Sequence, residues 1–381
     1  MPSLKLLHAA LFCPGPNGRW GLPLLLWGDP GTGKTAMCAQ LARSLNMAYY
    51  RLSPGEKGEG QFGVVPVPGA DGLLHYPAPD WVGSLGEGGI LLFDEINTGG
   101  PALQAPMLGA VQLGVLGSHT FSPRVRILGA ANEVADAAGG WDLAVALRNR
   151  FGHLDFEGLQ VAEWTDWLLG ARVSDSVTVL DAVAEERRVM EMWPGAIAKA
   201  SGLVAGFIRR RPDLLHKKPK KGEATRGWPS RRTWEYATVA LASADVHGLS
   251  EIETDELTTG FLGAGAVVEL AAWRTEADLP DPVALLDGKE TFTHDVRRLD
   301  RTMAVLSSCA SLCAPEKAQK RKERAGACWN LIRTVMKSTT DVVVPAARVL
   351  VTSKLVAGIP EAKPVLAEIH TVLEAAGIRA A

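Results

Sequence analysis

The sequence is poor in cysteine and has no long apolar run, and each shortage excludes a class of protein. Five cysteines occur among 381 residues and none forms a C-x-x-C pair, which disfavours a disulfide framework and a zinc cluster. No apolar stretch approaches the roughly 20 residues that a membrane-spanning helix needs. The N-terminal stretch lacks a convincing signal-peptide cleavage site. We therefore expect a cytoplasmic protein with no membrane partner.

An excess of one sign of charge is also missing. The sequence has 40 Lys plus Arg against 42 Asp plus Glu, which leaves a formal net charge of −2. A near-neutral chain has no general attraction to nucleic acid, so a nucleic-acid partner is not expected. Hydrophobic residues make up 47% and charged residues 22% of the sequence, which excludes a fibrous or disordered chain. At about 150 residues per domain, the length predicts two or three domains.

Residues 1–155 have the pattern of an α/β core with a largely parallel sheet. Three unbroken apolar runs, at residues 23–27, 89–93 and 125–131, predict strands that are buried on both faces. Residues 53–88 are rich in Gly and Pro and too long for an ordinary connection, which predicts a functional insertion into the core.

The pattern changes to helical periods after the α/β core. We predict a helical lid over residues 156–278, followed by a C-terminal helical region over residues 279–381 whose role the sequence leaves open. A polar and basic interruption at residues 216–227 and a Pro-rich break at residues 279–282 divide this half of the chain.

The segment from Gly28 to Thr35 has the form G-x-x-x-x-G-K-[ST] between a predicted strand and a predicted helix. Glycines there allow backbone N–H groups to wrap a diphosphate, while Lys34 reaches the β- and γ-phosphates and Thr35 ligates Mg²⁺. The same segment nearly satisfies the dinucleotide fingerprint G-x-G-x-x-A, which the Lys-Thr pair disfavours. The predicted phosphate-binding residues are Gly28, Asp29, Pro30, Gly31, Thr32, Gly33, Lys34, Thr35 and Ala36.

Polar residues follow the second and third predicted strands. Asp94 and Glu95 come directly after the apolar run at 89–93, where an α/β sheet presents ligand-binding groups. We expect Asp94 to hold Mg²⁺ through water and Glu95 to act as the general base toward the attacking water. Asn132 ends the third strand, where a neutral amide can orient that water without adding negative charge.

Two arginines follow within the sequence ALRNRF. The guanidinium groups of Arg148 and Arg150 suit the charge on a transferring phosphoryl group, and such an arginine can come from a neighbouring subunit.

These motifs together resemble the AAA+ superfamily, and specifically its MoxR branch, which is related to the dynein-type ATPases. The resemblance rests on Gly28 to Thr35, Asp94 to Asn97, Asn132, and Arg150 with Phe151. Residues 60–81 are similar to that branch's insert, and residues 228–235 are similar to the lid segment that supplies a sensor arginine, here Arg232. The family usually has Pro at the position of Arg231, so a shift of the sensor by one residue stays open.

The resemblance implies a P-loop NTPase αβα sandwich with a helical lid, and ATP with Mg²⁺ as cofactors. It also implies a ring-shaped homo-oligomer, a hexamer, in which Arg150 of the neighbouring subunit completes hydrolysis. The implied partner is a protein client or a protein with a von Willebrand factor A domain, with remodelling or chaperone-like maturation as the outcome.

Two other functions remain open. The first is a nucleotide-dependent switch or scaffold with little turnover, which has less need of Glu95, Asn132 and Arg150. The second is a nucleic-acid-associated NTPase motor, for which the basic residues at 209–211 and 216–227 are the only support. No aromatic residues are interleaved with these basic residues, so a solvated loop is the favoured interpretation.

Overall fold

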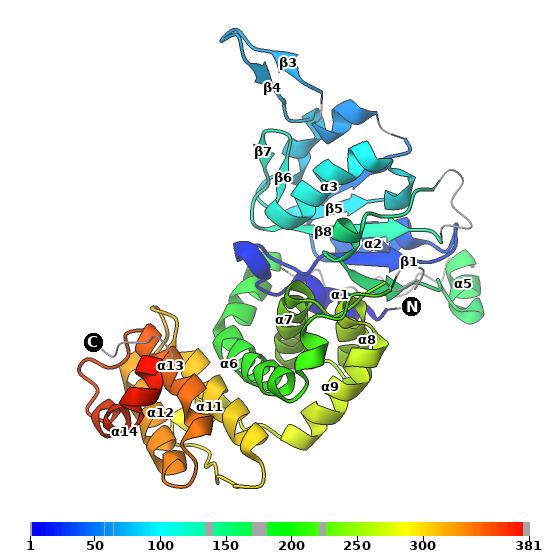
Figure 1. Ribbon diagram of the computed structural model, residues 1–381. Helices are drawn as coiled ribbons and strands as arrows, with labels where there is room; N and C mark the ends of the chain where they lie inside the picture. The colour runs from blue at the N-terminus through cyan, green and yellow to red at the C-terminus, as the bar shows by residue number, and fades with distance from the viewer. Residues whose placement is uncertain are drawn as a thin grey trace. The chain divides into compact units, whose positions relative to one another are not determined.

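The computed structural model describes residues 2–56, 58–63, 65–133, 140–169, 181–220 and 226–375. The chain divides into two compact units (Figure 1). The first unit is Met1–Met190 with Lys218–Val267, and the second is Glu191–Lys217 with Val268–Ala381. Among the described residues, no helix combines the length and the apolar character that crossing a membrane requires.

A parallel sheet of five strands forms the centre of the first unit. Its order is β2-β5-β8-β1-β9, and every neighbouring pair is parallel. The strands are β1 (Leu24–Trp27), β2 (Ala48–Leu52), β5 (Gly89–Phe93), β8 (Val125–Ala131) and β9 (Gly152–Asp155). Every residue of β1, β5 and β8 is buried, as expected for unbroken apolar runs in the middle of a sheet. The predicted α/β fold with a parallel sheet is confirmed.

Helices surround the sheet in the first unit. They are α1 (Leu4–Leu11), α2 (Lys34–Ser44), α3 (Pro101–Leu113), α4 (Val145–Arg148), α5 (Val161–Leu168), α7 (Arg231–His247) and α8 (Glu251–Leu262). Helix α1 begins at the N-cap Ser3 and packs on α7 and α8, while α8 packs on β9. Helix α6 (Ala182–Arg210) starts in the first unit and ends in the second.

The predicted insertion contains a small exposed hairpin above a buried base. Strands β3 (Val67–Pro68) and β4 (Leu74–His75) pair antiparallel and project from the sheet (Figure 1). The 3-10 helices on either side, Glu59–Phe62 and Asp80–Leu85, bury Phe62 and Trp81 in the core of the first unit. A second short hairpin pairs β6 (Val115–Leu116) with β7 (His119–Thr120).

The second unit is helical, as predicted for the C-terminal region. Its core surrounds the fully buried Trp329, whose indole Nε1 donates to the carbonyl of Leu355 over 2.8 Å. Cys309 and Cys313 lie in the same core as buried free thiols. The remaining α-helices among the described residues are α9 (Ala264–Ala277), α10 (Pro282–Leu286), α11 (Leu299–Cys313), α12 (Arg321–Met336), α13 (Val344–Thr352) and α14 (Ala362–Ala375).

Candidate nucleotide-binding site

The predicted phosphate loop runs from the end of β1 to the start of α2. Gly31 and Gly33 have φ angles of +79° and +95°, in the left-handed region that only glycine adopts readily. A Cβ atom on Gly28 would lie 2.1 Å from the backbone oxygen of Phe156, so the loop passes too close to that segment for any side chain. The loop and the N-terminus of α2 therefore form the kind of backbone cradle in which N–H groups bind phosphate.

Lys34, the first residue of α2, is buried at 8% exposure and held by three oxygen acceptors. Its Nζ donates to the carbonyls of Gly28 over 2.7 Å and Asp29 over 2.9 Å, and to Oδ1 of Asn132 over 3.0 Å. Burial lowers the pKa of the Lys34 ammonium, and the negative charge of Asp94 opposes that shift. None of the three acceptors is a carboxylate, so an anionic ligand would give the ammonium a direct charged partner.

Asp94 follows β5 and is buried at 4% exposure beside the phosphate loop. Thr35 donates its hydroxyl to Oδ2 of Asp94 over 2.8 Å, so the two predicted metal ligands lie in contact. A hydroxyl and a carboxylate are hard oxygen donors of the type that Mg²⁺ prefers. Arg51, on the adjacent strand β2, donates to the same Oδ2 over 3.0 Å and also pairs with Glu56. This contact of Arg51 was not predicted from the sequence.

Glu95 and Asn97 follow Asp94 in the turn after β5. Glu95 is exposed and has φ of +49°, a left-handed conformation that is uncommon for a residue with a side chain. Asn97 is buried, and its Nδ2 donates to the carbonyl of Asn132 over 2.9 Å. Asn97 thereby ties the turn after β5 to the end of β8, the strand between β5 and β1. As a result, Asn132 lies between the phosphate loop and the acidic turn.

The three predicted arginines lie elsewhere in the first unit. Arg150 is buried at 8% exposure, and its Nε donates to Oε1 of Gln112 over 2.8 Å. Burial and the charge of Arg232 lower the pKa of Arg150. Arg232 donates to Oδ1 of Asn149 over 3.2 Å, and Arg148 lies over a tryptophan ring at 6.0 Å. In the described ranges, none of these arginines hydrogen-bonds to Lys34, Thr35 or Asp94.

The buried His153 connects β1, the strand before the phosphate loop, to the segment that contains Arg148 and Arg150. This role of His153 was not predicted from the sequence. Trp27, the last residue of β1, donates its Nε1 to Nδ1 of His153 over 2.9 Å. Nε2 of His153 must then carry the proton, because it lies 3.0 Å from the carbonyl of Arg148, which can only accept. Burial lowers the pKa of His153 to about 4, which keeps the ring neutral.

Arg226 also has contacts near the site that were not predicted from the sequence. Its guanidinium pairs with Glu133, which follows Asn132, and with Asp155 at the end of β9. The same group lies 5.0 Å from the ring centroid of Trp27. Arg226 therefore connects the carboxyl ends of β8 and β9, the two strands that neighbour β1.

Part of the chain is similar to a known protein family. Residues 24–154 match the family of ATPases associated with various cellular activities, AAA. This segment is therefore similar to the ATPase domains of that family. The matched AAA segment begins at the first residue of β1 and ends within β9, so it includes Lys34, Asp94, Asn132 and Arg150 and leaves Arg232 outside.

The other comparisons add less. A crystal structure of a candidate ATPase from Cytophaga hutchinsonii is 12% identical and has a TM-score of 0.43, over 68% of this chain and 78% of that chain. No curated protein sequence matches the chain.

Proposed function

We propose that the protein is a Mg²⁺-dependent ATPase of the MoxR branch that forms a ring, a hexamer, and uses ATP hydrolysis to remodel a partner protein. The observation that carries this proposal is the convergence of Lys34, Thr35, Asp94 and Asn132 at the carboxyl ends of three adjacent parallel strands. Parallel α/β sheets bind their ligands at this edge. In this proposal the phosphate-binding Lys34 contacts the neutral amide of Asn132, and the two magnesium ligands Thr35 and Asp94 contact each other.

Each residue of the site has a role in this proposal. The ammonium of Lys34 binds the β- and γ-phosphates, and its amide partner Asn132 is then free to orient the attacking water. Thr35 and Asp94 hold Mg²⁺, which neutralises charge on the transferring phosphoryl group. Glu95 accepts the proton of the water, and its exposed position leaves room for both nucleotide and water.

Ring assembly is supported by α5, which buries none of its side chains in its own chain. Val161, Trp164 and Leu168 lie on one face of this helix with exposures of 80%, 49% and 59%. An isolated helix of this length is marginal in water, and an exposed apolar face marks a protein contact. We assign this face to the neighbouring subunit, and we assign the exposed hairpin β3–β4 to the client or to a von Willebrand factor A domain partner.

Arg150 is the trans-acting arginine in this proposal, with Arg148 and Arg232 as supporting residues of the site. Mixing Arg150→Ala subunits with Lys34→Ala subunits tests this role. The first variant keeps the nucleotide-binding lysine, and the second keeps the trans-acting arginine. Hydrolysis should recover in the mixture if Arg150 acts on the neighbour's nucleotide. An inactive mixture, with mixed assembly shown by cross-linking, would contradict the assignment.

A nucleotide switch with little turnover is the second candidate. The hydrogen bonds of Arg150 to Gln112 favour it, because they hold the guanidinium inside its own subunit. Gln112→Ala removes that acceptor and discriminates the two functions. Faster hydrolysis than in the wild type indicates an ATPase whose arginine has to be released, whereas unchanged, negligible hydrolysis indicates the switch.

A nucleic-acid motor has less support. Arg210 pairs with Asp300 at 3.2 Å and Glu276 at 3.4 Å, and Arg211 pairs with Asp213 at 2.9 Å. These arginines are already neutralised by acidic neighbours, so they offer little attraction to a phosphate backbone.

A further inference from the structure

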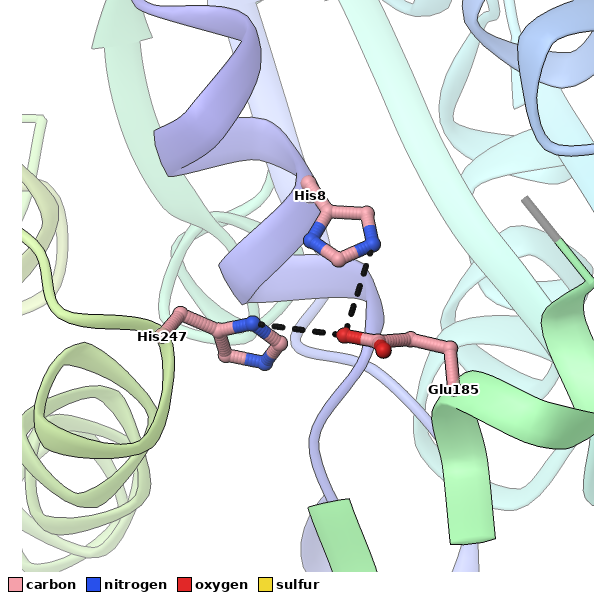
Figure 2. A group of neighbouring side chains, drawn as sticks. All are labelled: His8, Glu185 and His247. Carbon is pink, nitrogen blue, oxygen red and sulfur yellow. Dashed lines mark ion pairs between the residues drawn. The ribbon is translucent and has the colours of Figure 1, made fainter. Parts of the chain in front are cut away.

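Two imidazoles and one carboxylate from three helices converge in the first unit, outside the nucleotide site (Figure 2). His8 lies in α1, Glu185 in the first turn of α6, and His247 is the last residue of α7. Oε1 of Glu185 lies 3.8 Å from Nε2 of His8 and 3.7 Å from Nδ1 of His247. One ligand atom from each residue lies within 4.8 Å of the other two.

Each imidazole turns a nitrogen that can carry a lone pair toward the carboxylate (Figure 2). Nε2 of His247 donates to the carbonyl of Phe12 over 2.9 Å, so Nδ1, which faces Glu185, carries the lone pair. A backbone carbonyl on the outer nitrogen is the arrangement that fixes metal-binding histidines. Nε2 of His8 is buried and has no hydrogen-bond partner among the described residues. Its ring is stacked on Phe12 with centroids 4.6 Å apart, which fixes its direction.

The donor set matches a borderline-soft divalent ion. Two imidazole nitrogens and a carboxylate oxygen are typical ligands of Zn²⁺. A tetrahedral ion with bonds of about 2.0–2.1 Å holds its ligand atoms about 3.3 Å apart. The two separations from Glu185, 3.7 and 3.8 Å, would therefore shorten by about half an ångström. The two imidazole nitrogens lie within 4.8 Å of each other and would approach by at most about 1.5 Å, which side-chain rotation supplies. Burial lowers the pKa of both rings, so neither proton competes with an ion at neutral pH.

A guanidinium already contacts two of the three ligands. Arg188 donates its Nη2 to Oε1 of Glu185 over 2.7 Å and its Nε to Oε2 over 2.8 Å, and Nη2 lies 3.3 Å from Nδ1 of His247. These bonds satisfy the carboxylate and His247 but leave His8 Nε2 unsatisfied. The Arg188 side chain is 43% exposed, so it can turn into solvent when another cation arrives.

We propose that His8, Glu185 and His247 bind a divalent transition-metal ion, with Zn²⁺ as the ion that fits best, and that Arg188 takes its place when no ion is bound. The bound ion would join α1, α6 and α7, whereas Arg188 contacts Glu185 of its own helix α6 and His247 of α7. The ion is structural in this proposal, because the site lies apart from the phosphate loop and its acidic turn.

Metal titration of the full-length chain tests the site. The protein is stripped with a chelator and titrated, without nucleotide, with Co²⁺, whose visible absorption reports tetrahedral nitrogen and oxygen ligands, and the Co²⁺ is then displaced with Zn²⁺. The wild type should bind one ion per chain. His8→Ala and His247→Ala should each weaken binding at least about tenfold. His75→Ala is the matched control, because His75 is an exposed histidine paired with Asp71 at 2.8 Å, and it should change nothing.

The Arg188→Gln variant separates the proposal from a purely structural ion-pair network. Removing the competing cation should tighten Zn²⁺ binding about tenfold, and Zn²⁺ should restore any melting temperature that the variant loses. Failure of Zn²⁺ to bind the wild type and Arg188→Gln would overturn the proposal. The proposal would also be overturned if the His8→Ala/His247→Ala double variant bound Zn²⁺ as well as the wild type and Asp94→Asn did not bind it. That result would place the ion at the nucleotide site.

Discussion

Acidification should lower the stability of the first unit, because the unfolded chain takes up a proton on His153 at a pH above that at which carboxylates are protonated. Both ring nitrogens of His153 are engaged, by the indole of Trp27 and the carbonyl of Arg148, and the ring is 6% exposed. Protonation would place a second proton opposite the Trp27 N–H, beside the positive charges of Arg148 and Arg226. The folded state therefore resists the proton that the unfolded state accepts.

The size of the effect follows from the two pKa values. The pKa of His153 is about 4 in the folded state against 6.5 for a free imidazole. A depressed pKa gives stability that is complete above the unfolded value and is lost as the pH falls toward the folded value. Proton linkage with these two values predicts a loss of about 2 kcal/mol between about pH 7.5 and about pH 5.

The assay compares urea unfolding of the wild type and His153→Gln at both pH values. Glutamine accepts from Trp27 and donates to Arg148 but does not titrate. The wild type should lose about 2 kcal/mol more than the variant on acidification. Parallel losses in the two proteins would refute the reasoning, and so would a His153 pKa near 6.5 in an NMR titration of the folded protein.

Two further predictions concern stability and binding. Gly28→Ala places a Cβ atom 2.1 Å from a backbone oxygen and should weaken ATP binding in a filter or calorimetric assay. Gly58→Ala is the control, because its Cβ would meet no atom within 4 Å, and it should bind ATP normally. Equal affinities of the two variants would contradict the close packing at Gly28. Arg126→Met leaves the carboxylate of Glu186 buried without its 1%-exposed partner and should cost about 3 kcal/mol of unfolding free energy. Arg124→Met removes a 35%-exposed partner of the same carboxylate and should cost less than about 1 kcal/mol; equal losses in urea would show that burial does not decide the difference.

Much of the sheet could be predicted because its central strands are continuous apolar runs. The strands at 89–93 and 125–131 agree with β5 and β8, and β1 starts one residue later than the run at 23–27. Strand β2 was not predicted, since four of its five residues are only half-buried and its sequence includes Arg51. Strand β9 was also missed, because it is short and its buried His153 depends on a partner distant in sequence, Trp27.

The candidate site also contains contacts that could be predicted from the sequence and contacts that could not. The proximity of Lys34, Asp94 and Asn132 was predictable, because parallel strands bring their carboxyl ends to one edge of the sheet. The contact of Arg51 with Asp94 was not, since it depends on the pairing of β2 with β5. The boundary between the two compact units within α6 has no signal in the sequence either, because the helical pattern continues through it.

The most direct test of the proposed function is steady-state ATP hydrolysis per subunit across a range of protein concentrations, with Glu95→Gln as the blank. Both proteins should bind ATP with Mg²⁺, and Lys34→Ala should not. We predict that wild-type turnover per subunit rises steeply with concentration, because the site is completed between subunits. Negligible turnover at every concentration, despite demonstrated ATP binding, would contradict the ring ATPase.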